Sequence, residues 1–256
     1  MIPKVIHYCW FGRNPLPPLA RKCIASWKKY LPDYEIKEWN EDNFDVNIIP
    51  YTREAYEAKK YAFVSDYARF WILYHYGGLY FDTDVEVIKP LDDIIERGAF
   101  MGLERDYEPG ATAQYCAFAP GLGLGCNPGL GLGCNPDLGQ YKKILDFYAT
   151  LHFRNEDGTL NLKTIVEYTT NLLIQDGLSY ISAIQKVGDI YVYPSEYFCP
   201  YNIVTKRMHV TKNTRTIHHY MASWQDIPFS EKIKRILRNI LPESWLLWYN
   251  KKKHKH

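Results

Sequence analysis

Two aspartates, Asp82 and Asp84, follow an apolar run in the segment YHYGGLYFDTDVEV at residues 74–87. If Leu79–Phe81 form a buried strand, both carboxylates leave its end on the same side, because alternate strand residues share a face. Like charges this close repel each other unless a cation or hydrogen-bond donors compensate them. Aspartate is also common in turns. The spacing alone therefore leaves a turn and a cation site open.

A second polar group lies in the preceding apolar segment, FVSDYARFW at residues 63–71. Ser65, Asp66 and Arg69 stand at i, i+1 and i+4, so a helix would place them within one turn on one face. A buried structural ion pair would account for the acid and the guanidinium by themselves.

The reach of the chain predicts that both groups meet. Ten helical residues from Tyr76 back to Asp66 rise roughly 15 Å, and four strand residues from Gly78 forward to Asp82 extend about 13 Å. Because a diglycine turn reverses the chain between them, Asp66 and Asp82 should lie at similar heights, close to Asp84. Packing does not require three acids in one place, whereas a cation and a phosphorylated ligand would account for them.

The elements that must position these residues alternate between strands and helices. The apolar pattern predicts strands at Lys4–Trp10, Tyr34–Trp39, Leu79–Asp82, Val85–Ile88, Ala99–Leu103, Tyr115–Ala119, Ile190–Tyr193 and Thr216–Tyr220. It predicts helices at Pro18–Tyr30, Ala62–Tyr76, Leu138–Leu151 and Lys163–Gln175. This order indicates an α/β fold with a mostly parallel central sheet flanked by helices, whose ligands gather beyond the carboxyl ends of the strands. The tandem octapeptide GLGLGCNP, at residues 121–128 and 129–136, is predicted to be a duplicated loop beside the sheet.

Composition bounds the class of protein. The 256 residues, 46% hydrophobic and 23% charged, fit one large globular domain at residues 1–228 followed by a tail at 229–256. The net charge is +2, but residues 230–256 carry +6 and the remainder −4, so no nucleic-acid role is expected for the main body. Six cysteines without a CxxC pair predict reduced thiols. With no signal peptide and no apolar run that could span a bilayer, we expect a cytoplasmic protein.

The tail is basic and amphipathic. Its apolar residues at 233, 236, 237, 240 and 241 form one helical stripe with basic residues beside it, and the segment ends in KKKHKH. One interpretation is a terminal helix packed on the domain. The other is an interfacial anchor that holds the protein on the inner face of the membrane.

Four segments together resemble glycosyltransferase family 32: IPKVIHYCWFG, SWKKYLPDYEIKEWNEDN, FVSDYARFWILYHYGGLYFDTDVEV and the late IHHYMASW. The similarity extends from Ile2 to Trp224, and the core is also similar to the glucosyltransferase domains of large clostridial toxins. The resemblance implies a GT-A, Rossmann-like fold and a nucleoside-diphosphate sugar as donor. It further implies a divalent metal, usually Mn²⁺, and retention of the anomeric configuration.

The resemblance also implies which residues contact the donor. Trp10 would stack on the nucleotide base, and Tyr80 would line the donor pocket. The remaining donor contacts would be Ser65, Asp66 and Arg69 at the ribose and sugar hydroxyls, and Ser223 and Trp224 at the diphosphate.

The metal would be held by the DxD acids and by the late motif. Asp82 would lie near the ribose and sugar and reach the metal through water, and Asp84 would bind the metal directly. His218 or His219 would add a neutral imidazole, and the sequence leaves open which of them does. Carboxylate, imidazole and phosphate ligands together favour Mn²⁺ (or Mg²⁺) over Zn²⁺.

The predicted function is transfer of a hexose from a nucleotide sugar, UDP-hexose in preference to GDP-hexose, to a hydroxyl of a glycan or lipid-linked oligosaccharide in capsule or O-antigen synthesis. No carboxylate stands out as a nucleophile, so same-face attack is the preferred route to retention, and Glu104 and Asp106 are candidates for acceptor contacts. The alternatives are a protein-glycosylating effector, a non-catalytic sugar- or metal-binding module, and a phosphohydrolase of the haloacid dehalogenase type. The last would need Thr or Val where this chain has Glu86.

Overall fold

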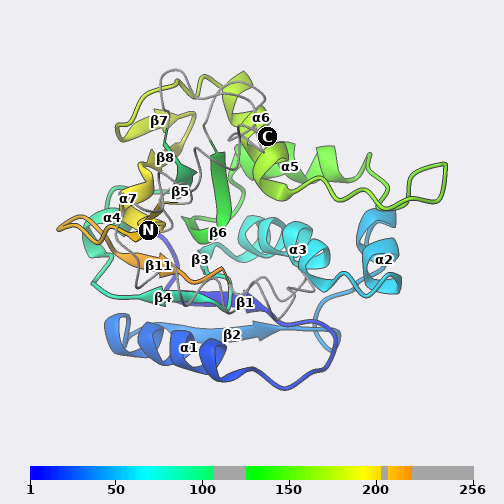
Figure 1. Ribbon diagram of the computed structural model, residues 1–256, viewed down its shortest axis with the longest axis horizontal. Coiled ribbons are helices and arrows are strands. Elements are labelled where there is room, and N and C mark those ends of the chain that lie inside the picture. The colour runs from blue at the N-terminus through cyan, green and yellow to red at the C-terminus, as the bar shows by residue number, and fades with distance from the viewer. Residues whose placement is uncertain (107–124, 203–206, 221–256) are drawn as a thin grey trace, which may run out of the picture.

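The computed structural model describes residues 1–106, 125–202 and 207–220, in which helices cover both faces of a central sheet (Figure 1). The strands are β1 (Val5–Cys9), β2 (Glu35–Trp39), β3 (Gly78–Tyr80), β4 (Val85–Val87), β5 (Phe100–Arg105), β6 (Gly125–Cys134), β7 (Gln185–Val187), β8 (Ile190–Tyr193), β9 (Tyr201–Asn202), β10 (Arg207–Met208) and β11 (Thr216–His218). The helices are α1 (Pro18–Tyr30), α2 (Pro50–Glu57), α3 (Tyr61–Tyr76), α4 (Asp92–Ile95), α5 (Gly139–Tyr148), α6 (Ile165–Gln175) and α7 (Ser195–Phe198). The predicted strand Tyr115–Ala119 and the tail at 229–256 lie outside the described residues.

The central sheet has seven strands in the order β2-β1-β3-β6-β5-β8-β7. Strands β2, β1, β3, β5 and β8 point the same way, whereas β6 and β7 run in the opposite direction. The α/β fold with a mostly parallel sheet is therefore confirmed. Two short antiparallel pairs, β4 with β11 and β9 with β10, stand apart from this sheet.

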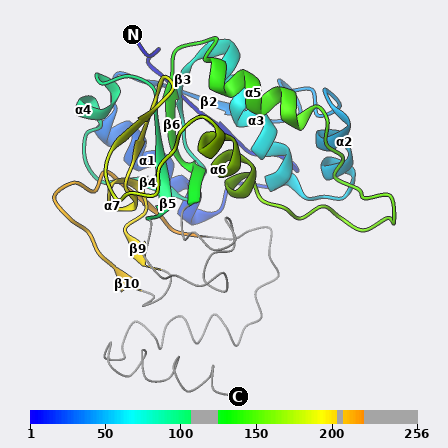
Figure 2. The ribbon, with the colours of Figure 1, turned by 90° about the horizontal axis from the view of Figure 1, so that it is seen from above.

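Two hydrophobic cores lie on the two faces of the sheet, because successive strand residues point to opposite sides. Leu79 and Phe81 face the core covered by α1, where Phe81 packs against Trp27 at 5.5 Å between ring centroids. Tyr80, between them, faces the core formed with α2, α3, α5 and α6. Figure 2 shows these four helices on one side of the sheet and α1, α4 and α7 on the other. None of the helices in the described ranges is long and apolar enough to cross a bilayer.

The diglycine turn after α3 sets how the helix and β3 lie against each other. The backbone φ is +63° at Gly77 and +95° at Gly78, values that residues with a Cβ rarely adopt. A Cβ on Gly78 would also lie 2.6 Å from the carbonyl oxygen of Val5 in β1. Helix α3 therefore ends where predicted, and β3 returns directly beside β1.

A buried histidine of β1 fastens this turn. The Nδ1 atom of His7 accepts a hydrogen bond from Trp39 Nε1 at 3.0 Å, and its Nε2 lies 3.1 Å from the carbonyl oxygen of Gly77. Both ring nitrogens are thus used by the neutral imidazole. Burial, the largest influence, lowers the pKa of His7 to about 4.

The prediction that the octapeptide repeat is a loop was wrong for residues 125–134, which include the second half of the first copy and most of the second. Residues 129–134 belong to β6, which lies between β3 and β5 in the middle of the sheet. The glycines allow this position, since a Cβ on Gly133 would lie 2.3 Å from the ring of Phe100. The pairing of β6 with β5 jumps from Leu132 to Asn127, so residues 128–131 leave the ladder as a bulge.

Candidate functional site

The DxD acids lie in a tight turn between β3 and β4. The strand β3 ends at Tyr80, two residues earlier than predicted, and the N–H of Val85 donates to the carbonyl oxygen of Asp82 at 3.0 Å. The N–H of Asp82 donates to the carbonyl oxygen of Gly129 in the β6 bulge at 3.1 Å. The turn and the carboxylate cluster, which the sequence left as alternatives, therefore occur together.

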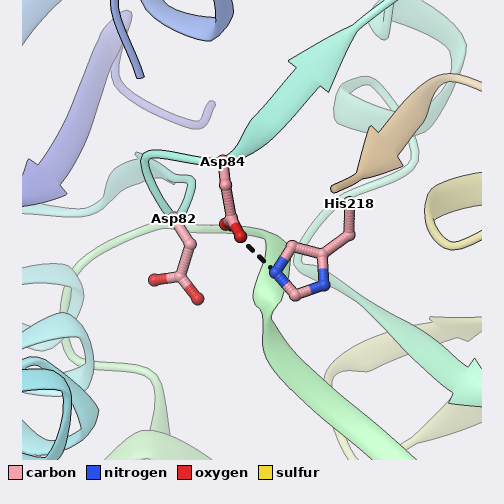
Figure 3. Close-up of side chains that lie close together, drawn as sticks. All are labelled: Asp82, Asp84 and His218. Carbon is pink, nitrogen blue, oxygen red and sulfur yellow. Dashed lines mark ion pairs between the residues drawn. The ribbon is translucent and has the colours of Figure 1, made fainter. Parts of the chain in front are cut away.

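The side chains of Asp82 and Asp84 converge with His218, which ends β11 (Figure 3). One ligand atom from each of the three lies within 4.8 Å of the other two, and the Nε2 atom of His218 is 3.1 Å from Asp84 Oδ1. Asp84 and His218 are buried. Two carboxylates and an imidazole form a donor set that suits a divalent cation.

The side chains of the two candidate histidines have different partners. His219 turns away from the cluster, and its Nε2 lies 2.8 Å from Glu86 Oε2 in β4. Of the two, the structure brings His218, not His219, to the DxD acids.

The Asp66–Arg69 pair of α3 reaches the same turn, as the chain-reach argument predicts. The Nη2 atom of Arg69 lies 2.9 Å from Asp66 Oδ1 and 3.3 Å from Asp82 Oδ1. The backbone oxygen of Ser65 accepts a hydrogen bond from Arg69 Nε at 3.0 Å. The guanidinium is therefore fixed between one helical acid and the first DxD acid.

The side chains of Tyr80 and Cys9 also adjoin this cluster. The hydroxyl of Tyr80 donates to Asp82 Oδ1 at 3.1 Å, and the Arg69 guanidinium lies 5.1 Å from the centre of the Tyr80 ring. The buried thiol of Cys9, at the end of β1, interacts with the hydroxyls of Tyr80 and Ser65. Sequence reasoning treated Cys9 only as a reduced cysteine. The pairing of His7 with Tyr80 in parallel strands places Cys9 beside Asp82, and that register is not visible in the sequence.

Of the remaining predicted donor contacts, Ser65 adjoins the cluster through Arg69 and Cys9, whereas Trp10 has its side-chain hydrogen bond elsewhere. Trp10 donates its indole N–H to the carbonyl oxygen of Asn14 at 2.6 Å, and Ser65 donates its hydroxyl to the carbonyl oxygen of Tyr61 at 3.2 Å. Trp10 follows β1 at the same edge of the sheet as the DxD turn. Ser223 and Trp224 lie outside the described residues.

The two acceptor candidates differ in their surroundings. Asp106 accepts hydrogen bonds from the backbone N–H and the hydroxyl of Ser195, which begins α7, so its carboxylate has a structural contact. Glu104 accepts a hydrogen bond from the hydroxyl of Tyr220 at 3.0 Å. The ring of Tyr220 packs 4.2 Å from that of His218. Glu104 is therefore joined to the cluster and Asp106 is not.

The electrostatics of the cluster favour a bound cation. Burial opposes a charge on His218, but Asp84 and Asp82 outweigh it and raise the pKa of the imidazole. Burial also raises the pKa of Asp66, against the opposing effect of Arg69. Burial works against the charge on Arg69, yet the neighbouring acids raise its pKa further and keep it a cation. The charge of Arg69 and the raised pKa values of His218 and Asp66 therefore offset the repulsion among the carboxylates of the cluster.

Comparison with known proteins identifies this part of the chain. Residues 17–101 match the family model described as the glycosyltransferase sugar-binding region containing DXD motif. This stretch of the chain is therefore similar to the DXD-containing region of glycosyltransferases. This DXD region includes α3 and both acids of the turn, whereas His218 lies outside it.

Two curated relatives are similar in sequence to part of this chain. Inositol phosphoceramide mannosyltransferase 1 of Schizosaccharomyces pombe is 31% identical over 111 residues, which are 39% of this chain and 33% of the relative. An uncharacterized glycosyltransferase of Acanthamoeba polyphaga mimivirus is 35% identical over 107 residues, which are 40% of this chain and 43% of that protein. The matches thus span less than half the length of these relatives. Among solved structures, the PaToxG glycosyltransferase superposes with a TM-score of 0.49 at 20% identity, covering 69% of this chain and 70% of that one.

Proposed function

We propose that this chain is a metal-dependent glycosyltransferase that moves a hexose from a nucleoside-diphosphate sugar to a hydroxyl of a glycan or lipid-linked saccharide. The observation that carries the proposal is the convergence of Asp82, Asp84 and His218 beside the Asp66–Arg69 pair. The match of residues 17–101 to the DXD sugar-binding region supports it.

The residues fit a divalent cation. The Nδ1 atom of His218 is buried and has no hydrogen-bond partner among the described residues, which is costly for a polar atom. A ring that turns so that Nδ1 faces a metal ion would relieve that cost. If Nε2 held the ion instead, Nδ1 would be the atom available for a hydrogen bond that orients the imidazole. Asp84 and His218 would hold the ion, with Asp82 beside them, and oxygen-rich ligation with one imidazole suits Mn²⁺ or Mg²⁺. When bound, the cation would neutralise charge that develops on the leaving diphosphate.

The chain's own residues would orient the donor. Arg69 and the Tyr80 hydroxyl fix the carboxylate of Asp82 from two directions, which leaves it placed to accept a hydrogen bond from a sugar or ribose hydroxyl. Trp10, at the end of β1, would stack on the base, and Ser65 would contact the ribose. The three acids that the described residues bring to the cluster are each paired with Arg69 or His218, which favours retention by same-face attack, with the leaving phosphate taking the acceptor proton.

The names of the curated relatives guide the choice of donor and acceptor. Three relatives in Schizosaccharomyces pombe are inositol phosphoceramide mannosyltransferases, so mannose belongs with glucose and galactose among the donors to test. Their acceptor is a lipid, which supports a lipid-linked acceptor here as an alternative to capsule or O-antigen glycans. The basic, amphipathic sequence at 229–256 would serve such an acceptor, and flotation with anionic liposomes would test it.

The proposal is tested by measuring hydrolysis and transfer with a panel of UDP- and GDP-hexoses, each with Mn²⁺, with Mg²⁺ and with chelator. The Asp84→Asn variant should lose about 100-fold or more in turnover, by comparison with the loss of other single electrostatic contacts in active sites, and should keep the fold. Asp33→Asn, at an aspartate with a side chain 76% exposed, is the matched control and should behave as the wild type. Full metal-dependent turnover by Asp84→Asn, or no turnover with any donor, would refute the assignment.

A further inference from the structure

The end of β11 carries two adjacent histidines that point to opposite sides of a two-stranded ladder. Strand β11 pairs with β4 so that His218 is opposite Val85, and the backbone N–H of His219 then donates to the carbonyl oxygen of Asp84 at 3.0 Å. Because successive strand residues alternate in direction, only one of the two can face the DxD acids. His218 shares the buried side with Val85, and its side chain is 10% exposed.

His219 takes the other side, where it belongs to a chain of charged groups. Its Nε2 atom lies 2.8 Å from Glu86 Oε2. The same oxygen accepts a hydrogen bond from Lys22 Nζ, in α1, at 2.9 Å. The side chains of Glu86 and His219 are 19% and 27% exposed. Glu86 is a ladder residue and Lys22 belongs to α1, which packs against β4, so this contact ties the end of β11 to both elements.

We propose that His219 is a positioning residue of the metal site: through Glu86 and Lys22 it fixes the rotation of the β11 end, and thereby the placement of the His218 imidazole against Asp84. Without the contact, the end of β11 keeps the backbone hydrogen bond from His219 to Asp84 and the contacts of the His218 ring with Asp84 and Tyr220, but it loses its link to Glu86 and α1. A twist at His219 moves His218 directly, because the two residues are adjacent. This role explains the doubled histidine, in which one ring binds and the other orients the backbone.

The inference rests on the proposed metal site, and titration of the full chain with Mn²⁺ alone, followed by EPR of the free ion, tests both. His218→Ala should abolish specific binding. His219→Ala should weaken the Mn²⁺ affinity about tenfold, as removal of outer-shell partners commonly does. His219→Gln, whose amide can still donate to Glu86, should stay within about threefold of the wild type because it restores the contact. The exposed His209 provides the matched control, and His209→Ala should bind as the wild type does.

The outcomes separate the alternatives. Binding by His219→Ala and His219→Gln as weak as that of His218→Ala would make His219 a ligand and overturn the proposal. Binding by His219→Ala equal to that of the His209→Ala control would show that the contact positions nothing. Absence of Mn²⁺ binding by the wild type would instead refute the metal-dependent function.

A readout in the metal-free chain keeps the two failures distinguishable. Long-range ¹H–¹⁵N spectra of the histidine rings report the tautomer and mobility of His218 without any ion. The ring signals of His218 should coincide in the wild type and in His219→Gln, and they should shift or broaden in His219→Ala as the ring loses its fixed placement. Unchanged His218 shifts in His219→Ala would overturn the positioning role whatever the metal data show.

Discussion

Acidification should destabilise this fold because it protonates His7, a buried histidine of β1. Its imidazole is 2% exposed and uses both nitrogens, with the indole of Trp39 on one side and the carbonyl of Gly77 on the other. A second ring proton would displace the hydrogen bond from Trp39, and a buried charge would result. The folded chain therefore resists protonation at a pH where the unfolded chain accepts it.

The size and sign of the effect follow from the pKa of His7. It is about 4 in the folded chain and 6.5 for an ordinary histidine, and the difference corresponds to roughly 3 kcal/mol of unfolding free energy. Because the folded pKa is the lower one, this contribution is complete above pH 6.5 and is lost as the pH falls toward 4. Between these values the unfolding free energy should fall by up to about 1.4 kcal/mol per pH unit.

Urea unfolding of the wild type and of His7→Gln, followed by tryptophan fluorescence from pH 7.5 to 4.5, measures this contribution. Glutamine can donate to Gly77 but does not titrate, so the difference in unfolding free energy between the two chains should shrink by about 2–3 kcal/mol on acidification. Other groups cancel in that difference, including Asp66, whose raised pKa acts in the opposite direction. A difference that stays constant within about 1 kcal/mol over this range would refute the reasoning.

Two further predictions concern the elements that carry the cluster. Gly78→Ala should lower the free energy of unfolding in urea by at least about 3 kcal/mol, because the positive φ is combined with a Cβ 2.6 Å from the Val5 oxygen. The control Gly158→Ala, with a positive φ and no atom within 4 Å, should lower it by about 1–2 kcal/mol. Equal losses would show that the close approach to β1 is unimportant. Arg69→Ala should cost about 3–5 kcal/mol because it leaves buried carboxylates unpaired, whereas Arg13→Ala, at a side chain 62% exposed, should leave the unfolding free energy nearly unchanged. A loss at Arg69 as small as that at Arg13 would contradict the buried network.

The helix–turn–strand unit could be predicted from sequence because its signals are local. Continuous apolar residues and two glycines fix α3, the reversal and β3 within a short stretch, and the two arms then have lengths that simple rises per residue give. The meeting of Asp66, Arg69 and Asp82 followed from that arithmetic. Only the end of β3 was misjudged, because the turn from Asp82 to Val85 is closed by a backbone hydrogen bond that leaves no mark in the side-chain pattern.

The central strand β6 and the choice between the two histidines depend on distant partners. A segment as rich in glycine as β6 has little intrinsic strand preference. It is a strand because it pairs with β3 on one side and with β5 on the other, and its glycines leave room for neighbouring rings such as that of Phe100. Likewise, either His218 or His219 could face Asp84 until the register of β11 on β4 is known. Such registers are set by the whole fold.

The hydrogen bond from the Asp82 N–H to the Gly129 oxygen links the DxD turn to its neighbouring strand through peptide groups alone. A substitution in β6 can therefore loosen the turn only by changing the path of the backbone. The position of the turn is therefore set by the backbone of β6, independently of the side chains that surround it. For a redesign of ligand preference, the glycines of β6 are positions to keep.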